Sequence, residues 1–287
     1  MGRMRLLVTG AAGMLGQAVV SAATRLGHDV AALPRAELDI TDAERVRRAL
    51  GAVQPAAIVN CAAWTDVDGA EADEAATTRV NGDGTANVAA AAAALGVRLV
   101  HVSTDYVFDG TKTTPWLESD PVAPLGAYGR SKLAGEEAIV AAGGEHAIVR
   151  TAWLFGAGGT NFVDTMLRLA EERDEVAVVT DQVGSPTWSG HLAPALVELA
   201  ERRGDAGVFH AAVEGSCSWN ELAVEAFHVA GAECRVLPTT SERLPRPARR
   251  PAYSVLGTER EPGVRLPAWQ DGVGAYVRER LAVGAGR

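Results

Sequence analysis

Hydrophobic residues in the first half of the chain form short runs separated by longer amphipathic stretches. Runs typical of buried strands lie at Arg5–Thr9, Asp29–Leu33, Ala57–Asn60, Arg98–Val102 and Ala147–Thr151. Stretches with helical periodicity lie at Met14–Leu26, Asp42–Leu50 (with Thr41 as N-cap), Asn81–Leu95 and Ala127–Ala142. Strands that alternate with helices predict right-handed βαβ units. We therefore expect an α/β fold built on a doubly wound parallel sheet of the Rossmann type.

The pattern changes after residue 151. Helical periodicity continues at Asn161–Glu172, His191–Arg202, Trp219–Ala230 and Trp269–Leu281, with short apolar runs at Val176–Val179 and Val208–Ala211. Prolines at 238, 245, 247 and 251 alternate with arginines and predict an irregular surface or cleft-lining loop. The last four residues, 284–287, are expected to fray. A second, smaller α/β domain is therefore expected mainly over residues 152–287, with some segments returning to the sheet.

A glycine-rich turn joins the first predicted strand to the first predicted helix. Gly10 permits a tight turn, Gly13 lets a pyrophosphate approach the backbone, and Gly16 lets the helix pack closely on the sheet. The helix start at Met14 and Leu15 offers free N–H groups to phosphates. A purely structural turn is the alternative, but the place of this turn in the first βα unit favours a dinucleotide. Residues 1–151 are thus a predicted NAD(P)-binding domain, which leaves residues 152–287 mainly for the substrate.

The end of the second predicted strand bears on the choice of cofactor. An acidic residue there would accept the ribose hydroxyls of NAD, but Arg35 occupies this region and suits a 2′-phosphate. A solvated turn arginine is the alternative. Asp39 and Ile40 are expected beside the adenine. After the third predicted strand, the small residues Cys61, Ala62 and Ala63 let a cofactor lie against the backbone. We expect NADPH, with NADH possible.

A tyrosine and a lysine lie four residues apart in a predicted helix. Tyr128 and Lys132 therefore share one face of it. A phenol with a pKa of about 10 is a poor acid or base at neutral pH, and a nearby cation favours the phenolate. Only two of the 27 basic residues are lysines, Lys112 and Lys132, which weakens the alternative of a chance pair on a solvated helix. The pair therefore makes proton exchange with a substrate oxygen feasible.

Two hydroxyl groups end the fourth predicted strand, at Ser103 and Thr104. The carboxyl ends of parallel strands face the ligand crevice, so Thr104, with Ser103 beside it, is expected to hydrogen-bond a substrate carbonyl oxygen. Turn chemistry is the alternative reading of such a pair.

The net charge of −9 argues against a general nucleic-acid binder. The cysteines Cys61, Cys217 and Cys234 lack the spacing of a disulfide framework or a zinc site, and we expect no metal. The N-terminus lacks a signal peptide's apolar core, and no window of the sequence is typical of a membrane span. We therefore expect a cytoplasmic protein without a membrane or nucleic-acid partner.

Taken together, these segments resemble the extended short-chain dehydrogenase/reductase family and, within it, the dTDP-4-dehydrorhamnose reductase family. The matching stretches run in family order from residue 8 to about 190. They are Thr9–Gly16 (TGAAGMLG), Leu38–Asp42 (LDITD), Val59–Glu71 (VNCAAWTDVDGAE), Val80-Asn81, Ser103–Gly110 (STDYVFDG), Tyr128–Lys132 (YGRSK), Arg150–Gly156 (RTAWLFG) and Asp181–Thr187 (DQVGSPT). Weaker similarity continues at Ser218-Trp219 and Arg250–Leu256.

The resemblance implies that NAD(P)H reduces the C4 ketone of a dTDP-linked 4-keto-6-deoxyhexose, giving dTDP-L-rhamnose or a related, dihydrostreptose-like deoxysugar. It implies that Tyr128 donates the proton, that Lys132 lowers the pKa of Tyr128 and holds the nicotinamide ribose, and that Thr104 hydrogen-bonds the carbonyl oxygen. The implied substrate contacts are Ser103, Thr104, Tyr106, Tyr128, Trp153, Gln182 and Arg250, of which Arg250 suits the phosphates.

Two departures and two alternatives remain open. Trp64 stands where the family has tyrosine. Related enzymes can bind magnesium at a dimer interface through C-terminal glutamates, but Glu279 is the last acidic residue here, so a monomer or a homodimer without metal is expected. One alternative is a sugar-nucleotide epimerase or dehydratase that retains NAD⁺. The other is a non-catalytic regulatory subunit of the methionine adenosyltransferase beta type.

Overall fold

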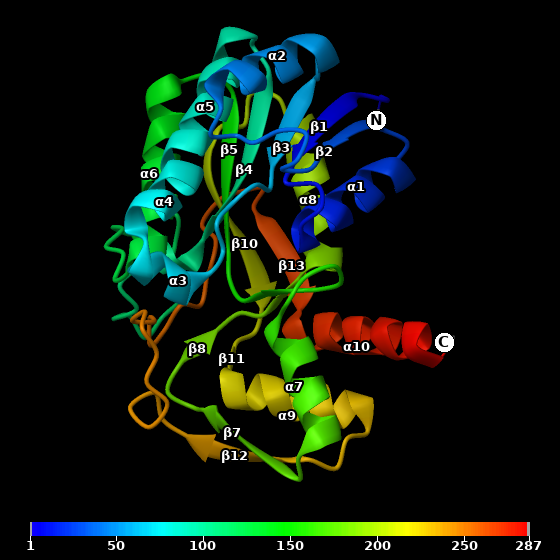
Figure 1. Cartoon of the computed structure of the whole chain (residues 1–287), viewed down its shortest axis with the longest axis vertical. Helices are drawn as coiled ribbons and strands as arrows, with labels where there is room; N and C mark the ends of the chain where they lie inside the picture. The colour runs from blue at the N-terminus through cyan, green and yellow to red at the C-terminus, as the bar shows by residue number, and fades with distance from the viewer. Residues whose placement is uncertain (1, 286–287) are drawn as a thin grey trace.

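The computed structural model describes residues 2–285, and its centre is a parallel sheet of seven strands (Figure 1). The strand order is β13-β10-β5-β4-β3-β1-β2, and every neighbouring pair is parallel. The strands are β1 (Arg5–Thr9), β2 (Asp29–Leu33), β3 (Ala57–Asn60), β4 (Arg98–Thr104), β5 (His146–Thr151), β10 (Gly207–Glu214) and β13 (Val264–Ala268). The predicted α/β class and parallel sheet are confirmed.

Helices cover both faces of this sheet (Figure 1). On one face lie α1 (Met14–Arg25) and α8 (Ser189–Glu201). On the other lie α2 (Ala43–Val53), α5 (Thr85–Ala94) and α6 (Ala127–Ala142). Successive strand residues therefore enter different cores: Leu6 packs with the residues of α1 and α8, whereas Leu7 packs with those of α2 and α5. Because both faces are buried, the strands read as continuous apolar runs rather than as alternating ones.

Most of the elements that follow β5 form a smaller lobe beyond the carboxyl ends of the strands (Figure 1). Its helices are α7 (Phe162–Glu172), α9 (Trp219–Ala230) and α10 (Trp269–Ala285). Its strands pair two by two: β7 (Glu175–Val179) with β12 (Arg235–Thr239), β8 (Val183–Gly184) with β11 (Cys217–Ser218), and β6 (Leu154–Phe155) with β9 (Thr187–Trp188). The chain after residue 151 thus contributes both to this lobe and, through β10 and β13, to the central sheet.

Several predicted bounds need correction. The N-cap of α2 is Asp42, not Thr41, because the Asp42 carboxylate accepts from two N–H groups of the first turn. The predicted helix Asn81–Leu95 is the end of a longer run that starts with α3 (Val67–Ala72) and α4 (Glu74–Thr78) and passes through a π-helical turn at Arg79–Gly84.

The C-terminal helix and six strands also differ from expectation; the unpredicted strands are the two-residue strands β6, β8, β9 and β11, together with β12 and β13. The strands β12 and β13 were not predicted because each contains a proline, which edge strands tolerate. Helix α10 continues to Ala285, beyond its predicted end at Leu281. The expected fraying of residues 284–287 stays a prediction, and residues 286–287 lie outside the described range.

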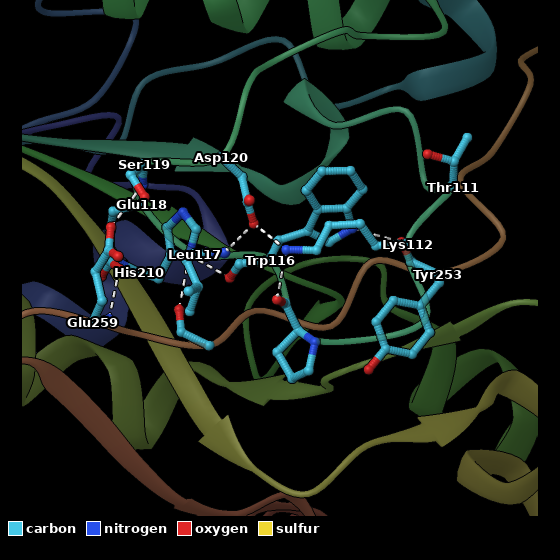
Figure 2. Close-up of polar contacts among 12 residues, drawn as sticks. Thr111, Lys112, Trp116, Leu117, Glu118, Ser119, Asp120, His210, Tyr253 and Glu259 are labelled. Carbon is cyan, nitrogen blue, oxygen red and sulfur yellow. Dashed lines mark hydrogen bonds and ion pairs between the residues drawn. The ribbon is translucent and has the colours of Figure 1, made fainter.

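The loop between β4 and α6 is held by hydrogen bonds to β10 and to residues 253–259, and by an ion pair within the loop (Figure 2). Trp116 donates from its indole nitrogen to the Tyr253 carbonyl oxygen at 3.0 Å. The Glu118 carboxylate accepts from the backbone N–H of His210 and of Glu259, both at 3.0 Å. Lys112 forms an ion pair with Asp120. This loop begins just after Thr104 and ends where α6 begins, so these contacts fix the relative position of two elements that carry predicted catalytic residues.

Candidate active site

A cavity of about 750 Å³ opens where the carboxyl ends of β1, β3, β4 and β5 meet the smaller lobe. The predicted cofactor residues all line it: Gly10, Gly13, Met14, Leu15, Gly16, Arg35, Asp39, Ile40, Cys61, Ala62, Ala63 and Lys132. The predicted substrate residues that line it are Ser103, Thr104, Tyr106, Tyr128 and Trp153. Gln182 and Arg250 are not among the lining residues.

The glycine-rich turn has little room for any side chain. Gly10 has a φ of +62°, and a Cβ there would lie 2.7 Å from the Ala62 nitrogen. A Cβ on Gly16 would lie 2.2 Å from the Gly10 carbonyl oxygen. Helix α1 starts after Gly13 without a side-chain cap, so its first N–H groups face the cavity side free of a capping partner. A close backbone and free N–H groups together fit the diphosphate of a dinucleotide.

We expect Gly16→Ala to lower the free energy of unfolding by about 2 kcal/mol, since the new methyl group meets backbone that has to move. The matched control is Gly51→Ala inside α2, where a Cβ would meet nothing within 4 Å. That change is expected to raise the free energy of unfolding by up to about 1 kcal/mol, because alanine favours a helix over glycine. Urea denaturation of both variants measures the difference, and equal effects would contradict the close contact.

The charged residues after β2 interact with each other. The Arg35 guanidinium is 80% exposed and lies 3.6 Å from an Asp39 oxygen. The other Asp39 oxygen accepts from the N–H and the hydroxyl of Thr41, and these hydrogen bonds hold the pKa of Asp39 below its usual range. Arg35 is therefore available at the cavity edge, whereas the Asp39 carboxylate is already engaged within its own turn.

Tyr128 lies in the first turn of α6, and Thr104 ends β4. Both line the cavity, and the Tyr128 ring meets the Tyr106 ring edge to face, with centroids 5.6 Å apart. Burial raises the pKa of Tyr128 to about 12, and the Asp105 carboxylate raises it too, whereas a hydrogen bond with Thr104 lowers it. The phenol is therefore protonated at neutral pH.

Lys132 lies one helical turn after Tyr128, but its ammonium points into the sheet. Nζ donates to the Val102 carbonyl oxygen at 2.7 Å and lies 3.2 Å from His101 Nε2. Burial lowers the pKa of Lys132 to about 8. The pKa of Tyr128 is raised by burial and by Asp105 and lowered by Thr104, and the implied lowering by Lys132 stays a prediction.

Ser103 lines the cavity, but its hydroxyl is already engaged by a buried carboxylate. It donates to Glu136 Oε1 at 2.5 Å, and Glu136 is held in turn by Arg150 through a buried ion pair with an N–O distance of 2.6 Å. Residues i and i+2 of a strand share a face, so the Ser103 side chain lies with that of His101 on the α6 side of the sheet. Thr104 points the other way and remains the hydroxyl available beside Tyr128.

Two stacked tryptophans form the wall of the cavity on the side of the smaller lobe. The rings of Trp153 and Trp219 are 3.6 Å apart and nearly parallel, at 6°. The backbone of Trp153 has a φ of +47°, a value that residues other than glycine rarely adopt. Such strained conformations are often found at functional sites. A Cβ on Gly184 would meet the Trp153 ring at 2.4 Å. Gln182 lies behind this pair, where its carbonyl oxygen accepts from Trp219 Nε1 at 3.1 Å. Gln182 therefore positions the tryptophan wall but does not line the cavity. Trp219 does line the cavity, and it was not predicted as a site residue from the sequence.

A family model described as the RmlD substrate binding domain matches residues 4–281. A dTDP-4-dehydrorhamnose reductase from Streptomyces griseus is 48% identical over 264 residues, covering 90% of this chain and 87% of that protein. The chain belongs to the dTDP-4-dehydrorhamnose reductase family. As members of this family are reductases, the chain is an oxidoreductase, and the resemblance seen in its motifs is confirmed.

Two further comparisons involve a reductase of another dTDP-keto sugar and a crystal structure with NADP. A dTDP-4-keto-6-deoxy-D-glucose reductase from Streptomyces niveus is 47% identical over 264 residues, covering 91% of each chain. The crystal structure of a dTDP-4-dehydrorhamnose reductase from Bacillus anthracis in complex with NADP superimposes with a TM-score of 0.93 at 36% identity. It covers 97% of this chain and 100% of that chain.

Arg250 and Trp64 each depart from expectation, Arg250 in where its side chain lies and Trp64 in its residue type. The Arg250 guanidinium is bound by both oxygens of Asp68, at 3.1 and 3.0 Å, and lies outside the cavity lining. The structure therefore does not place Arg250 in the cavity as a phosphate ligand. Trp64, found where tyrosine was expected, lines the cavity, and its indole N–H donates to the Asp66 carbonyl oxygen at 3.0 Å.

Asp105 was not predicted as a site residue from the sequence, although it directly follows Thr104. It is 1% exposed, lines the cavity and accepts from the Thr104 hydroxyl at 3.0 Å. Burial raises the pKa of Asp105 to about 6. A carboxyl that binds its proton more tightly when folded contributes stability at low pH, and this contribution is lost as the pH rises through its folded pKa.

Asp105→Asn is therefore expected to gain stability relative to the wild type as the pH rises. The difference in the free energy of unfolding should grow between about pH 4 and pH 6, by about 3 kcal/mol in total, and then stay level. Chemical denaturation of both proteins at a series of pH values measures it. A difference that does not vary with pH would show that Asp105 is not buried as a titrating group.

The structure also bears on metals and membranes. Within residues 2–285, no three His, Cys, Asp or Glu side chains are grouped so that they could hold a metal ion. No helix in the same range combines the length and the apolar character needed to cross a membrane.

Proposed function

We propose that this chain uses NADPH to reduce the C4 ketone of a dTDP-linked 4-keto-6-deoxyhexose, giving dTDP-L-rhamnose or a related deoxysugar. The observation that carries the proposal is the shared cavity, which brings the glycine-rich turn together with Thr104, Tyr128 and Lys132. The reductase names of the relatives support the reaction, and their differing sugars leave the exact substrate to the test below.

The dinucleotide would lie along the ends of β1, β2 and β3. The N–H groups at Met14 and Leu15 would hold its diphosphate, and Arg35 would bind the 2′-phosphate, which favours NADPH over NADH. Cys61, Ala62 and Ala63 would lie against its nicotinamide half, and Lys132 would bind the nicotinamide ribose. When bound, NADPH supplies a hydride to the C4 carbonyl carbon.

Tyr128 supplies the proton in this proposal. Its pKa of about 12 keeps the phenol protonated at neutral pH, as a proton donor requires. The oxygen that forms at C4 is an alkoxide, a far stronger base than a phenolate, so the transfer from Tyr128 remains downhill despite the raised pKa. Thr104, which hydrogen-bonds Tyr128, would orient the C4 oxygen toward the phenol.

The sugar would lie between the Tyr128 side of the cavity and the Trp153–Trp219 wall. Apolar ring faces suit the C–H faces of a deoxysugar, and the close stack keeps the wall rigid. Tyr106, beside Tyr128, would contact the sugar as well. Ser103, Gln182 and Arg250 act in this proposal through neighbouring residues, by way of Glu136, Trp219 and Asp68 respectively.

The experiment is to incubate the purified chain with dTDP-4-dehydro-L-rhamnose, and with a panel of other dTDP-4-keto sugars, in the presence of NADPH or NADH. Stoichiometric consumption of NADPH with formation of the 4-hydroxy sugar is expected. An epimerase or dehydratase would instead carry NAD⁺ as purified and regenerate it, without net oxidation of NADPH. A regulatory subunit would bind a partner enzyme and reduce no sugar. Either result would overturn the proposal.

A further inference from the structure

A buried row of polar side chains crosses three strands and ends at Lys132. Thr9 of β1, Asn60 of β3 and His101 of β4 are neighbours in the strand register, and each is at most 1% exposed. Their side chains touch in order: Thr9 Oγ1 lies 2.5 Å from Asn60 Oδ1, and Asn60 Nδ2 lies 2.9 Å from His101 Nδ1. His101 Nε2 then lies 3.2 Å from Lys132 Nζ. No step of the proposed reaction uses the first three residues.

The direction of these hydrogen bonds suits a neutral lysine. The Thr9 hydroxyl donates to the Asn60 oxygen, and the Asn60 amide nitrogen donates to His101 Nδ1. An imidazole that accepts at Nδ1 carries its proton on Nε2 when neutral. This Nε2–H faces Lys132 Nζ, and only an uncharged amine has a lone pair with which to accept it.

An ammonium at Lys132 requires the opposite direction. It can only donate, so His101 Nε2 must accept and the ring proton must lie on Nδ1. Asn60 then has to present its oxygen to Nδ1, which a half-turn of its amide achieves without a change of shape. The amide nitrogen now donates to the Thr9 hydroxyl oxygen, so every contact in the row is kept.

Within residues 2–285, Lys132 Nζ has two hydrogen-bond partners, and of these only His101 can both donate and accept a hydrogen bond. Val102 offers a carbonyl oxygen at 2.7 Å, which can only accept. Glu136, one turn further along α6, favours the ammonium, as does Cys61, but both act at a distance and are outweighed by burial. Tyr128 lies one turn earlier on α6. The pKa of His101 is held well below its usual value by burial and by Lys132, so the ring stays neutral and the charge change falls on Lys132.

We propose that His101 is a positioning residue, and that the Thr9–Asn60–His101 row reverses its hydrogen bonds when Lys132 gains or loses a proton, thereby holding Lys132 in place in both charge states. One proton is taken up from solution in the change, and the imidazole carries one proton before and after it. The assignment rests on the proposed function only for what Lys132 does once it is held.

The first test is an NMR titration of the wild-type chain, with one variant used only to assign the signals. Selectively labelled lysine gives two side-chain signals, and Lys112→Arg identifies the one from Lys132. Lys132 is expected to titrate near pH 8. The ¹⁵N signals of His101 are expected to report a ring proton that moves between Nε2 and Nδ1 with the same midpoint. A His101 tautomer that stays the same on both sides of the Lys132 midpoint overturns the proposal.

Two variants test the positioning role. His101→Gln keeps a side-chain amide that can present either an oxygen or an N–H group to Lys132, whereas His101→Phe keeps the ring volume without either. The Lys132 midpoint is expected to fall by about one pH unit in His101→Phe, because the hydrogen bond lost from the ammonium is stronger than the one lost from the neutral amine. In His101→Gln the midpoint is expected to stay near the wild-type value. Equal midpoints in the wild type and both variants overturn the role.

A kinetic readout separates this inference from the proposed function. The fall of kcat/KM above about pH 8 is expected to move with the Lys132 midpoint in His101→Phe and to return in His101→Gln. The NMR titration needs no turnover. If the chain reduced no keto sugar and the Lys132 and His101 signals still moved together, the proposed function would fail while this inference stood.

Discussion

Tyr128→Phe is expected to lower kcat for the C4 reduction by a factor on the order of 10³, the scale set by the loss of a positioned proton donor. The change removes one oxygen atom from a cavity-lining ring and leaves the edge-to-face contact with Tyr106 in place. Binding of NADPH should therefore be retained. Steady-state kinetics with the keto sugar and fluorescence titration with NADPH measure the two effects separately.

The matched control is Tyr253→Phe. Tyr253 does not line the cavity, and it contributes its backbone oxygen rather than its hydroxyl to the hydrogen bond with Trp116. Removing its hydroxyl is expected to leave kcat and KM unchanged. Full activity in Tyr128→Phe would show that another group delivers the proton, and a loss of NADPH binding in that variant would show that the phenol acts mainly in binding.

Lys132→Met is expected to lower kcat/KM on the order of 10²-fold and to weaken NADPH binding, because the buried ammonium next to the cavity is lost. Methionine fills a similar volume, so the chain should still fold. The residual activity should also lose its fall above about pH 8, since the group whose pKa lies there is gone. Kinetics from pH 6 to pH 10 and circular dichroism provide the measurements.

The only other lysine provides the control for this change. Lys112 pairs with Asp120 and donates to the Pro115 carbonyl oxygen at 3.2 Å, and it does not line the cavity. Lys112→Met is expected to lower the free energy of unfolding by up to about 1 kcal/mol, as for a partly exposed ion pair, with no change in the pH profile. If both lysine variants lost activity alike, the effect would come from stability and not from the site.

Much of the sheet could be predicted because its strands are buried on both faces. Runs such as Leu6-Leu7-Val8 must be apolar throughout, which makes them visible without any knowledge of their neighbours. The proline-containing strands β12 and β13 could not be predicted, because a proline breaks the local pattern and only the edge position in the folded sheet makes it acceptable.

The candidate site also contains residues that could be predicted from local sequence and residues that could not. The residues of the glycine-rich turn and Tyr128 and Lys132 were found from local spacing, since a turn and one helix face are short-range features. Trp219 was missed, because its stack on Trp153 joins positions 66 residues apart in a chain where nothing local marks the contact. Ser103 was placed in the substrate site by its position at a strand end and by resemblance, and Arg250 by resemblance, but their side chains are bound by Glu136 and Asp68.

The amino-acid sequence by itself determined the α/β class, the family and the chemical groups of the reaction, because these depend on local periodicity and on short motifs. Only the tertiary structure decided the electrostatic state of those groups. The pKa of Tyr128 is raised and that of Lys132 is lowered because both groups are buried, and His101 faces Lys132 because β4 and α6 pack together. The burial of a polar group and the identity of its partners arise from long-range packing, so they cannot be predicted from the spacing of residues along the chain.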